Sequence, residues 1–164
     1  MKARHPVEKP IGGFDASLDT VISTFFGTGF FPVAPASFAS AVVAVLMLLA
    51  GGLPIAMRAA LLVLVSVVGT WAAGRTETRY GHDARCIVID EVGGMLAATL
   101  LIPWDLKHLI VAFLFFRLCD VLKLPPAYQL ESLPGGAGIM ADDIAAGFQT
   151  LILLFAAGVL LPFF

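Results

Sequence analysis

The chain has 164 residues, of which 59% are hydrophobic and 13% are charged, and its formal net charge is −2. Soluble domains carry about a quarter charged residues, whereas this chain has a mean hydropathy of +0.94. The composition excludes a disordered chain, a disulfide-rich secreted scaffold and an autonomous nucleic-acid binder. It predicts a protein that lies in a membrane and contacts membrane lipids.

The N-terminal part is expected to be broken rather than to form a straight helix. Residues 1–19 are polar and are predicted to lie on the membrane surface. The apolar segment that follows, Val21–Ser37, is interrupted by two glycines and two prolines: Gly27, Gly29, Pro32 and Pro35. Backbone groups freed by such breaks must be satisfied inside the protein or at a wet cavity. We therefore expect a bent segment that dips into the membrane interface and returns.

The remaining apolar segments predict about five helices. A helix needs about 20 apolar residues to cross a bilayer core of about 30 Å, and Glu91–Ile102 offers only about 18 Å. The fold expected is an all-α integral membrane protein, a compact bundle of about five helices with a re-entrant, broken N-terminal segment, in a single domain spanning 1–164. The expected helices are Phe38–Met57, Ala59–Gly74, Glu91–Ile102, Lys107–Leu122 and Asp142–Phe164, with polar loops at Arg75–Asp90 and Lys123–Ala141.

The basic residues predict the orientation of this bundle. With five crossings, Arg58 and Lys107 fall on one side, and all other basic residues fall on the opposite side: Lys2, Arg4, Lys9, Arg75, Arg79, Arg85, Arg117 and Lys123. Loops rich in Lys and Arg stay in the cytoplasm. Since the acidic residues other than Asp105 share that side, the functional face is expected to be cytoplasmic.

A first candidate cluster is the pair Asp90 and Glu91, which opens the short helix. Ionisable groups at membrane depth are costly and mark functional sites. The alternative is that the two carboxylates only stabilise a helix N-terminus, where acidic side chains are favoured.

A second cluster comprises Arg117, Asp120 and Lys123, which are spaced by three and are expected to share one helix face. The planar fork of arginine and the compact ammonium of lysine both suit a phosphate group. Alternatively, Arg117 and Asp120 pair with each other and the basic side chains extend to lipid headgroups.

A third cluster is the glycine-rich run from Gly135 to Gly138, followed by Asp142 and Asp143 at the expected start of the last helix. Glycines let backbone N–H groups approach an anion, and paired carboxylates suit Mg²⁺, which prefers oxygen ligands. A flexible loop and an N-terminal cap would explain the same residues. Together the three clusters suit a divalent metal and a phosphorylated lipid.

Four motifs in this order resemble the phosphatidylglycerophosphatase A family. They are Gly27–Pro35, His82-Asp83 with Ile87–Glu91, Phe116-Arg117 with Asp120 and Lys123, and Gly135–Asp143 with Gly147. The resemblance covers about residues 18–150. It implies a multi-pass enzyme of the bacterial cytoplasmic (inner) membrane. Such an enzyme is a Mg²⁺-dependent phosphatase that converts phosphatidylglycerophosphate to phosphatidylglycerol.

With that resemblance, roles can be assigned to the clusters. Asp90, Glu91, Asp142 and Asp143 are predicted to hold Mg²⁺, and Asp83 or Asp120 to be a further ligand or an orienting group. Arg117 and Lys123 are predicted to neutralise the phosphate. The backbone is predicted to cradle it at one of two glycine segments: Gly27, Thr28 and Gly29, or Gly135, Gly136 and Gly138. The nucleophile is left open between a water molecule and an aspartate.

Two other classes of function remain as alternatives. A small cation or solute transporter would use the embedded carboxylates to bind its cargo, but its inverted repeats should appear as matching broken helices in two halves. A non-catalytic lipid-binding or assembly subunit would not need paired carboxylates near Arg117. The sequence leaves the oligomeric state, the number of metal ions and the acyl-chain preference open.

Overall fold

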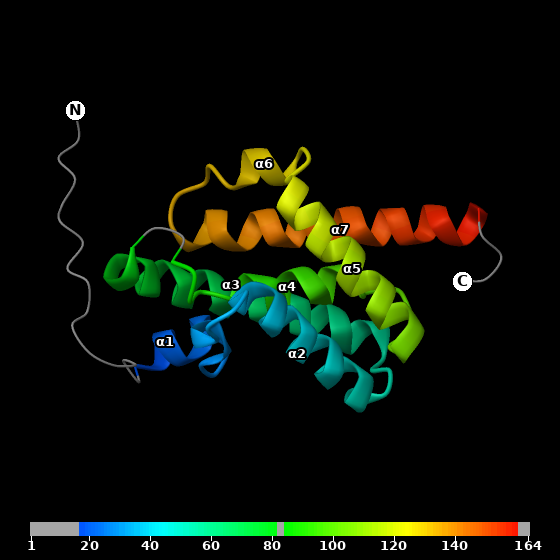
Figure 1. The fold of residues 1–164 in the computed structure, drawn as a ribbon, viewed down its shortest axis with the longest axis horizontal. Helices are drawn as coiled ribbons and strands as arrows, with labels where there is room; N and C mark the ends of the chain where they lie inside the picture. Colours follow the sequence, from blue (N-terminus) through cyan, green and yellow to red (C-terminus); the bar gives the residue numbers. More distant parts are fainter. Residues whose placement is uncertain (1–16, 82–83, 161–164) are drawn as a thin grey trace.

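The structure is a computed structural model that describes residues 17–81 and 84–160. These residues form seven α-helices and one 3₁₀ turn and contain no strand. The predicted all-α class is confirmed. The helices lie side by side in an elongated bundle whose long direction follows α3 and α7 (Figure 1).

The N-terminal segment is broken, as predicted. It consists of α1 (Leu18–Ser23), a 3₁₀ turn η1 (Thr28–Phe30) and a further bend before α2 (Pro35–Ala50). The chain reverses between α1 and η1 through left-handed backbone at Phe25, Phe26 and Gly27. One boundary is wrong, because Asp19 does not lie on a polar surface segment. It is buried in α1 and forms an ion pair with Arg79 of α3; residues 1–16 of that segment lie outside the described residues.

The two helices predicted at Phe38–Met57 and Ala59–Gly74 have other boundaries in the structure. Helix α2 ends at Ala50 because Gly51 adopts a left-handed conformation with φ 66°, which stops a helix at little cost for glycine. Helix α3 (Ile55–Tyr80) then runs without a break. The predicted loop at Arg75–Asp90 is therefore wrong over its first part, since charged residues such as Arg75 and Glu77 are good helix formers.

Helix α4 (Ile89–Ala98) lies in the middle of the bundle, and every residue of it except Asp90 is buried. It packs against α7 (Gly136–Leu160) at a close crossing of two glycines. A Cβ atom at Gly147 would collide with the carbonyl oxygen of Gly94, so small residues at this point set the distance between the two helices. The crossing brings the start of α4 next to the first turns of α7.

Helix α5 (Leu106–Leu122) packs on α7 and α2, and the short α6 (Ala127–Leu130) lies within the connection to α7. The last helix begins at Gly136 rather than at Asp142, so the predicted loop at Lys123–Ala141 is wrong for its last residues. Asp142 and Asp143 consequently lie in the second turn of α7 and do not cap it.

The end of the bundle opposite Asp90 is held by Arg58 of α3. Its guanidinium donates to the carbonyl oxygens of Leu53 (2.7 Å) and Ile102 (2.5 Å) and lies 4.5 Å from the ring centre of Trp104. The bond to Ile102, with a further one to the carbonyl oxygen of Thr99 at 3.3 Å, satisfies carbonyl groups that follow the end of α4. These contacts anchor the short helix at the end away from its carboxylates.

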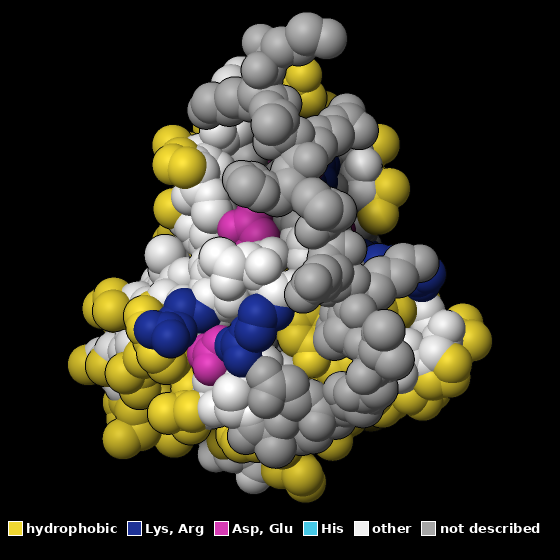
Figure 2. All heavy atoms as spheres, turned by 90° about the vertical axis from the view of Figure 1, so that its left-hand side faces the viewer, with side chains coloured by type: hydrophobic (Ala, Val, Ile, Leu, Met, Phe, Trp, Pro, Cys, Tyr) yellow, Lys and Arg dark blue, Asp and Glu magenta, His cyan; other side chains and the backbone are white. Residues whose placement is uncertain are grey.

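Two of the described helices, Ile55–Tyr80 and Gly136–Gly158, are long and apolar enough to cross a membrane. Their outer faces are rich in exposed Leu, Val and Phe side chains. Figure 2 shows one end of the bundle, where acidic and basic side chains gather in the middle and hydrophobic ones lie around the edge. This supports a membrane protein with one polar end, while five crossings stay a prediction.

Candidate active site

One cavity of about 350 Å³ lies at this polar end. Four helices contribute to it: the start of α2, the start of α4, the end of α5 and the early turns of α7. All three predicted charged clusters reach it. The charged residues that line it are Arg85, Asp90, Glu91, Arg117, Asp120, Lys123, Glu131, Asp142 and Asp143.

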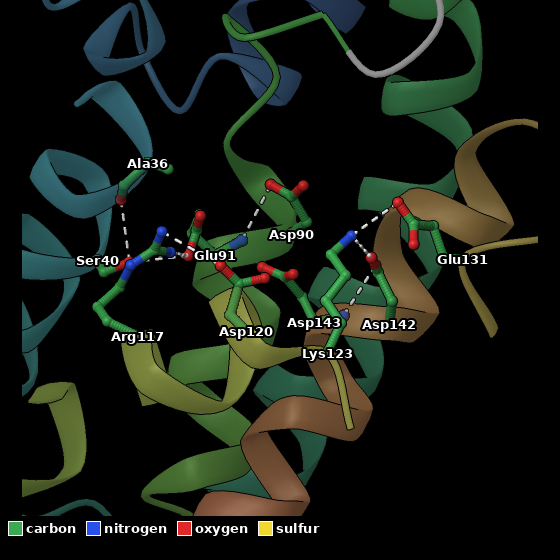
Figure 3. A network of polar contacts seen from close by, with 10 residues as sticks. All are labelled: Ala36, Ser40, Asp90, Glu91, Arg117, Asp120, Lys123, Glu131, Asp142 and Asp143. Carbon is green, nitrogen blue, oxygen red and sulfur yellow. Dashed lines mark hydrogen bonds and ion pairs between the residues drawn. The ribbon is translucent and has the colours of Figure 1, made fainter. Parts of the chain in front are cut away.

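Glu91 and Arg117 form one ion pair in this cavity (Figure 3). The Arg117 Nη1 atom donates to Glu91 Oε2 at 2.5 Å, and Nη2 lies 3.2 Å from Asp120 Oδ2. The hydroxyl of Ser40 donates to the same Glu91 oxygen at 2.9 Å. Glu91 is only 5% exposed, so this carboxylate is held by two donors away from water.

Lys123 forms a second group of ion pairs in the cavity, with Asp142 and Glu131. It ends α5 with a left-handed backbone, which turns its side chain toward α7 and not along the face of Arg117 and Asp120. Its ammonium donates to Asp142 Oδ2 at 2.8 Å and pairs with Glu131 Oε1 at 2.9 Å. Burial opposes the charge of Lys123, but these two partners outweigh it and raise the pKa of the amine above its ordinary value.

Asp143 lies between the two groups of ion pairs. It is 4% exposed, and its Oδ2 atom has no hydrogen-bond partner among the described residues. Its carboxylate points toward that of Asp120, with Asp90 and Glu91 nearby (Figure 3). A buried carboxylate beside other carboxylates is unfavourable unless a cation compensates it, so this position is suited to a positively charged ligand.

The fit of a divalent metal can be tested against these contacts. Six carboxylates and three basic side chains line the cavity, so the site has an excess of negative charge, and hard oxygen ligands are those that Mg²⁺ prefers. In the described part of the chain, no three of the candidate ligand side chains converge closely enough to hold an ion as they stand. The donor chemistry fits Mg²⁺, whereas binding would require side-chain movement.

The prediction that two glycine segments cradle the phosphate gains no support from the cavity lining. None of Gly27, Thr28, Gly29, Gly135, Gly136 and Gly138 is among the cavity-lining residues described. A Cβ atom at Gly29 would collide with the backbone of Cys86, and one at Gly136 with the carbonyl of Thr70. These two glycines allow close packing of the backbone. Asp83 lies outside the described residues.

The sequence reasoning missed two charged residues that line the cavity, Arg85 and Glu131. It also missed Ser40, which lies behind the lining and donates to Glu91. Ser40 is a buried polar residue in an apolar helix, which is a weak signal because a serine can also bond its own helix, as Ser40 does to Ala36. Neither Arg85 nor Glu131 was assigned a role in the site, since nothing in their local sequence shows that the chain returns them to the cavity.

Comparison with known proteins identifies relatives that are named as lipid phosphatases. The family model described as Phosphatidylglycerophosphatase A matches residues 21–158. A Bacteroides thetaiotaomicron protein named "Putative phosphatidylinositol-3-phosphatase" is 36% identical, covering 85% of this chain and 93% of its own length. The phosphatidylglycerophosphatase A proteins of Haemophilus influenzae and Escherichia coli are 32% and 29% identical, covering 83% and 84% of this chain and 86% and 82% of their own lengths. No solved structure matches.

The helical frame, its charged cavity and these relatives define an all-helical phosphatase that handles a lipid substrate. Within that class, the chain belongs to the phosphatidylglycerophosphatase A family. The resemblance found in the four sequence motifs is therefore confirmed.

Proposed function

We propose that this protein is a Mg²⁺-dependent phosphatase that hydrolyses phosphatidylglycerophosphate to phosphatidylglycerol and phosphate. The reaction takes place in the polar cavity, which faces the cytoplasm in a multi-pass protein of the bacterial inner membrane. The observation that carries the proposal is the joining of Arg117 and Lys123 to buried carboxylates in one cavity. The transporter alternative has no support from the relatives, which are named as phosphatases.

Arg117 and Lys123 are suited to receive the phosphate monoester. Each is already held by two carboxylates, so both cations are fixed before the substrate arrives and little reorganisation is needed. Arg117 can present two N–H groups to two phosphate oxygens, and Lys123 can approach from the α7 side as a point charge.

Asp143 is the strongest candidate for a metal ligand, since its Oδ2 atom lacks a hydrogen-bond partner within the described chain. Asp120 and Asp90 lie beside it, and the predicted ligands Glu91 and Asp142 are held by Arg117 and Lys123. Mg²⁺, when bound, would supply neutralisation of the phosphoryl oxygens. In the reaction an oxygen nucleophile bonds to phosphorus, the phosphorus–oxygen ester bond breaks, and the lipid alcohol takes up a proton.

Phosphate release from dioleoyl phosphatidylglycerophosphate in detergent micelles tests the proposal. We expect release with Mg²⁺, loss of release with EDTA, and recovery when Mg²⁺ is returned. Asp143→Asn should lower turnover by about a hundredfold or more. Asp105→Asn is the matched control, because Asp105 is an exposed N-cap far from the cavity and asparagine caps equally well. Full activity in EDTA would refute the metal role, and near-normal turnover of Asp143→Asn would refute the site.

The headgroup is tested with the same assay on a panel of substrates. Phosphatidylglycerophosphate, phosphatidate and phosphatidylinositol 3-phosphate carry the same monoester on different alcohols, and the last corresponds to the name of the Bacteroides relative. We expect the highest kcat/KM for phosphatidylglycerophosphate. A preference for the inositol lipid would keep the phosphatase assignment and overturn the substrate.

The orientation is tested by labelling a single cysteine introduced at Glu77, near the polar end of α3, in a chain without Cys86 and Cys119. We expect a membrane-impermeant reagent to label it in inverted vesicles and not in intact cells. Labelling from outside intact cells would place the cavity on the opposite side.

A further inference from the structure

A groove of about 200 Å³ lies between α2 and α5, beside the charged cavity. Within the described structure its lining is entirely apolar. On each helix the lining residues recur at one-turn spacing, so each helix turns a single face toward the groove. The residues that define it are Ala41, Ala44 and Leu48 of α2 with Leu106, Ile110 and Phe113 of α5.

The groove begins where the cavity ends. Ser37 lines the cavity one turn before Ala41 on α2, and Arg117 lines the cavity one turn after Phe113 on α5. The same two helices therefore contribute to both sites, one after the other along their length. The intervening turn measures about 6 Å along each helix, which leaves a short stretch between a bound phosphate and the apolar groove.

The groove has a closed floor and an open side. Leu109 at its floor is 2% exposed, whereas Val45 and Ile110 at its rim are 54% and 50% exposed. From Phe113 to Leu106 it runs for about 10 Å along α5. Its width depends on Ala41 and Ala44, because larger side chains at these positions would fill the space between the helices.

We infer that this groove holds one acyl chain of the lipid whose phosphate is bound in the cavity, an inference that rests on the proposed function. The occupant follows from continuity: a molecule with an anionic end in the cavity and an apolar end one turn further is a phospholipid. Moving a chain from the bilayer into the groove gains little hydrophobic free energy, since lipid tails are as apolar as the groove. The groove therefore orients the substrate and fixes the phosphate next to Arg117.

The test fills the groove without touching the charged residues. Ala44→Leu places three extra carbon atoms in the groove, and Ala60→Leu makes the same change on an exposed face of α3 that does not line the groove. Each variant is assayed on dioleoyl and on dihexanoyl phosphatidylglycerophosphate, which share a headgroup and differ in tail length. We expect Ala44→Leu to lower kcat/KM about tenfold for the long-chain lipid alone, because misplacement of a bound substrate reduces rate strongly.

Equal effects of Ala44→Leu on both lipids, or no effect on either, would overturn the inference that the groove holds an acyl chain. A wild-type protein that releases no phosphate from either lipid would instead overturn the proposed function. In that case a second measurement tests whether an acyl chain binds in the groove. Phosphatidylglycerophosphate that carries a diazirine at the end of one tail is photo-crosslinked to the protein in EDTA. Adducts on peptides 41–48 and 106–113 that decrease in Ala44→Leu support the groove, and adducts only elsewhere contradict it.

Discussion

The pair of Glu91 and Arg117 gives the sharpest prediction for stability. Both side chains are mostly buried, with 6% and 18% of their surface exposed, so solvent screens their interaction weakly. Removing one partner of a buried pair costs about 3–5 kcal/mol, because the other charge is left uncompensated. For Arg117→Met we expect a loss in that range. It would be a large part of the 5–15 kcal/mol that stabilises a typical domain.

Substitution of the other partner, Glu91, should lower the free energy of unfolding by less. In Glu91→Gln, Arg117 keeps Asp120 at 3.2 Å, and the glutamine oxygen can still accept from Ser40. We therefore expect a loss of about 1–2 kcal/mol. In the double variant no buried charge of this pair remains, so its loss should be smaller than the sum of the two single losses by about 2 kcal/mol.

Unfolding in detergent micelles by titration with sodium dodecyl sulfate provides the measurement. The signal is tryptophan fluorescence, to which buried Trp104 and half-exposed Trp71 both contribute. Lys107→Met removes an exposed cation from the other end of α5 and should change stability by less than about 0.5 kcal/mol. Additive losses in the double variant would refute the reasoning, since they would mean that Glu91 and Arg117 do not interact. Activity should be low in all three cavity variants whatever their stability.

Three further outcomes follow from other contacts. Gly147→Ala should cost about 1–3 kcal/mol in thermal unfolding and lower turnover, because the new methyl group collides with the Gly94 backbone, whereas Ala156→Val on the exposed side of α7 should do neither. Lys123→Met should lower the free energy of unfolding by the same amount at pH 7 and pH 9. The raised pKa of Lys123 keeps its stabilisation complete below the ordinary value of 10.5, and the stabilisation is lost only above it. A loss that is smaller at pH 9 than at pH 7 would contradict the ion pairs of Lys123. Arg85→Gln should raise KM about tenfold with little change in kcat, as expected for loss of a charge-assisted hydrogen bond to substrate, and an unchanged KM would remove Arg85 from substrate binding.

The chemistry-bearing residues were easier to predict than their partners. In an apolar chain every charge near membrane depth is conspicuous, and all the charged residues predicted for the site that the structure describes line one cavity. Which carboxylate pairs with which cation depends on contacts between distant segments, such as Lys123 with Asp142. The spacing of Arg117, Asp120 and Lys123 predicted one shared helix face, but the helix ends before Lys123 and changes its direction.

The glycines show a second limit of sequence reasoning. A glycine that lets a backbone bind an anion and a glycine that lets two helices approach both lack a Cβ atom, and only the neighbour distinguishes them. At Gly147 that neighbour is the backbone of Gly94, and at Gly136 it is Thr70. The end of α3 was predicted too early for a related reason. The charged residues after Gly74 continue the helix, and one of them, Arg79, forms an ion pair with the distant Asp19.

The short helix α4 explains why the site forms at one end of the bundle. A charged side chain in contact with lipid is costly, so an apolar bundle can gather charges only where its helices end or where protein surrounds them. Helix α4 meets both conditions: it begins at Ile89, level with the end of α5 and the second turn of α7, and other helices enclose it. The Gly94–Gly147 crossing holds it close to α7, and Arg58 satisfies the carbonyls at its far end. A helix too short to cross a bilayer is therefore what brings Glu91 to Arg117 and Asp143 inside the protein.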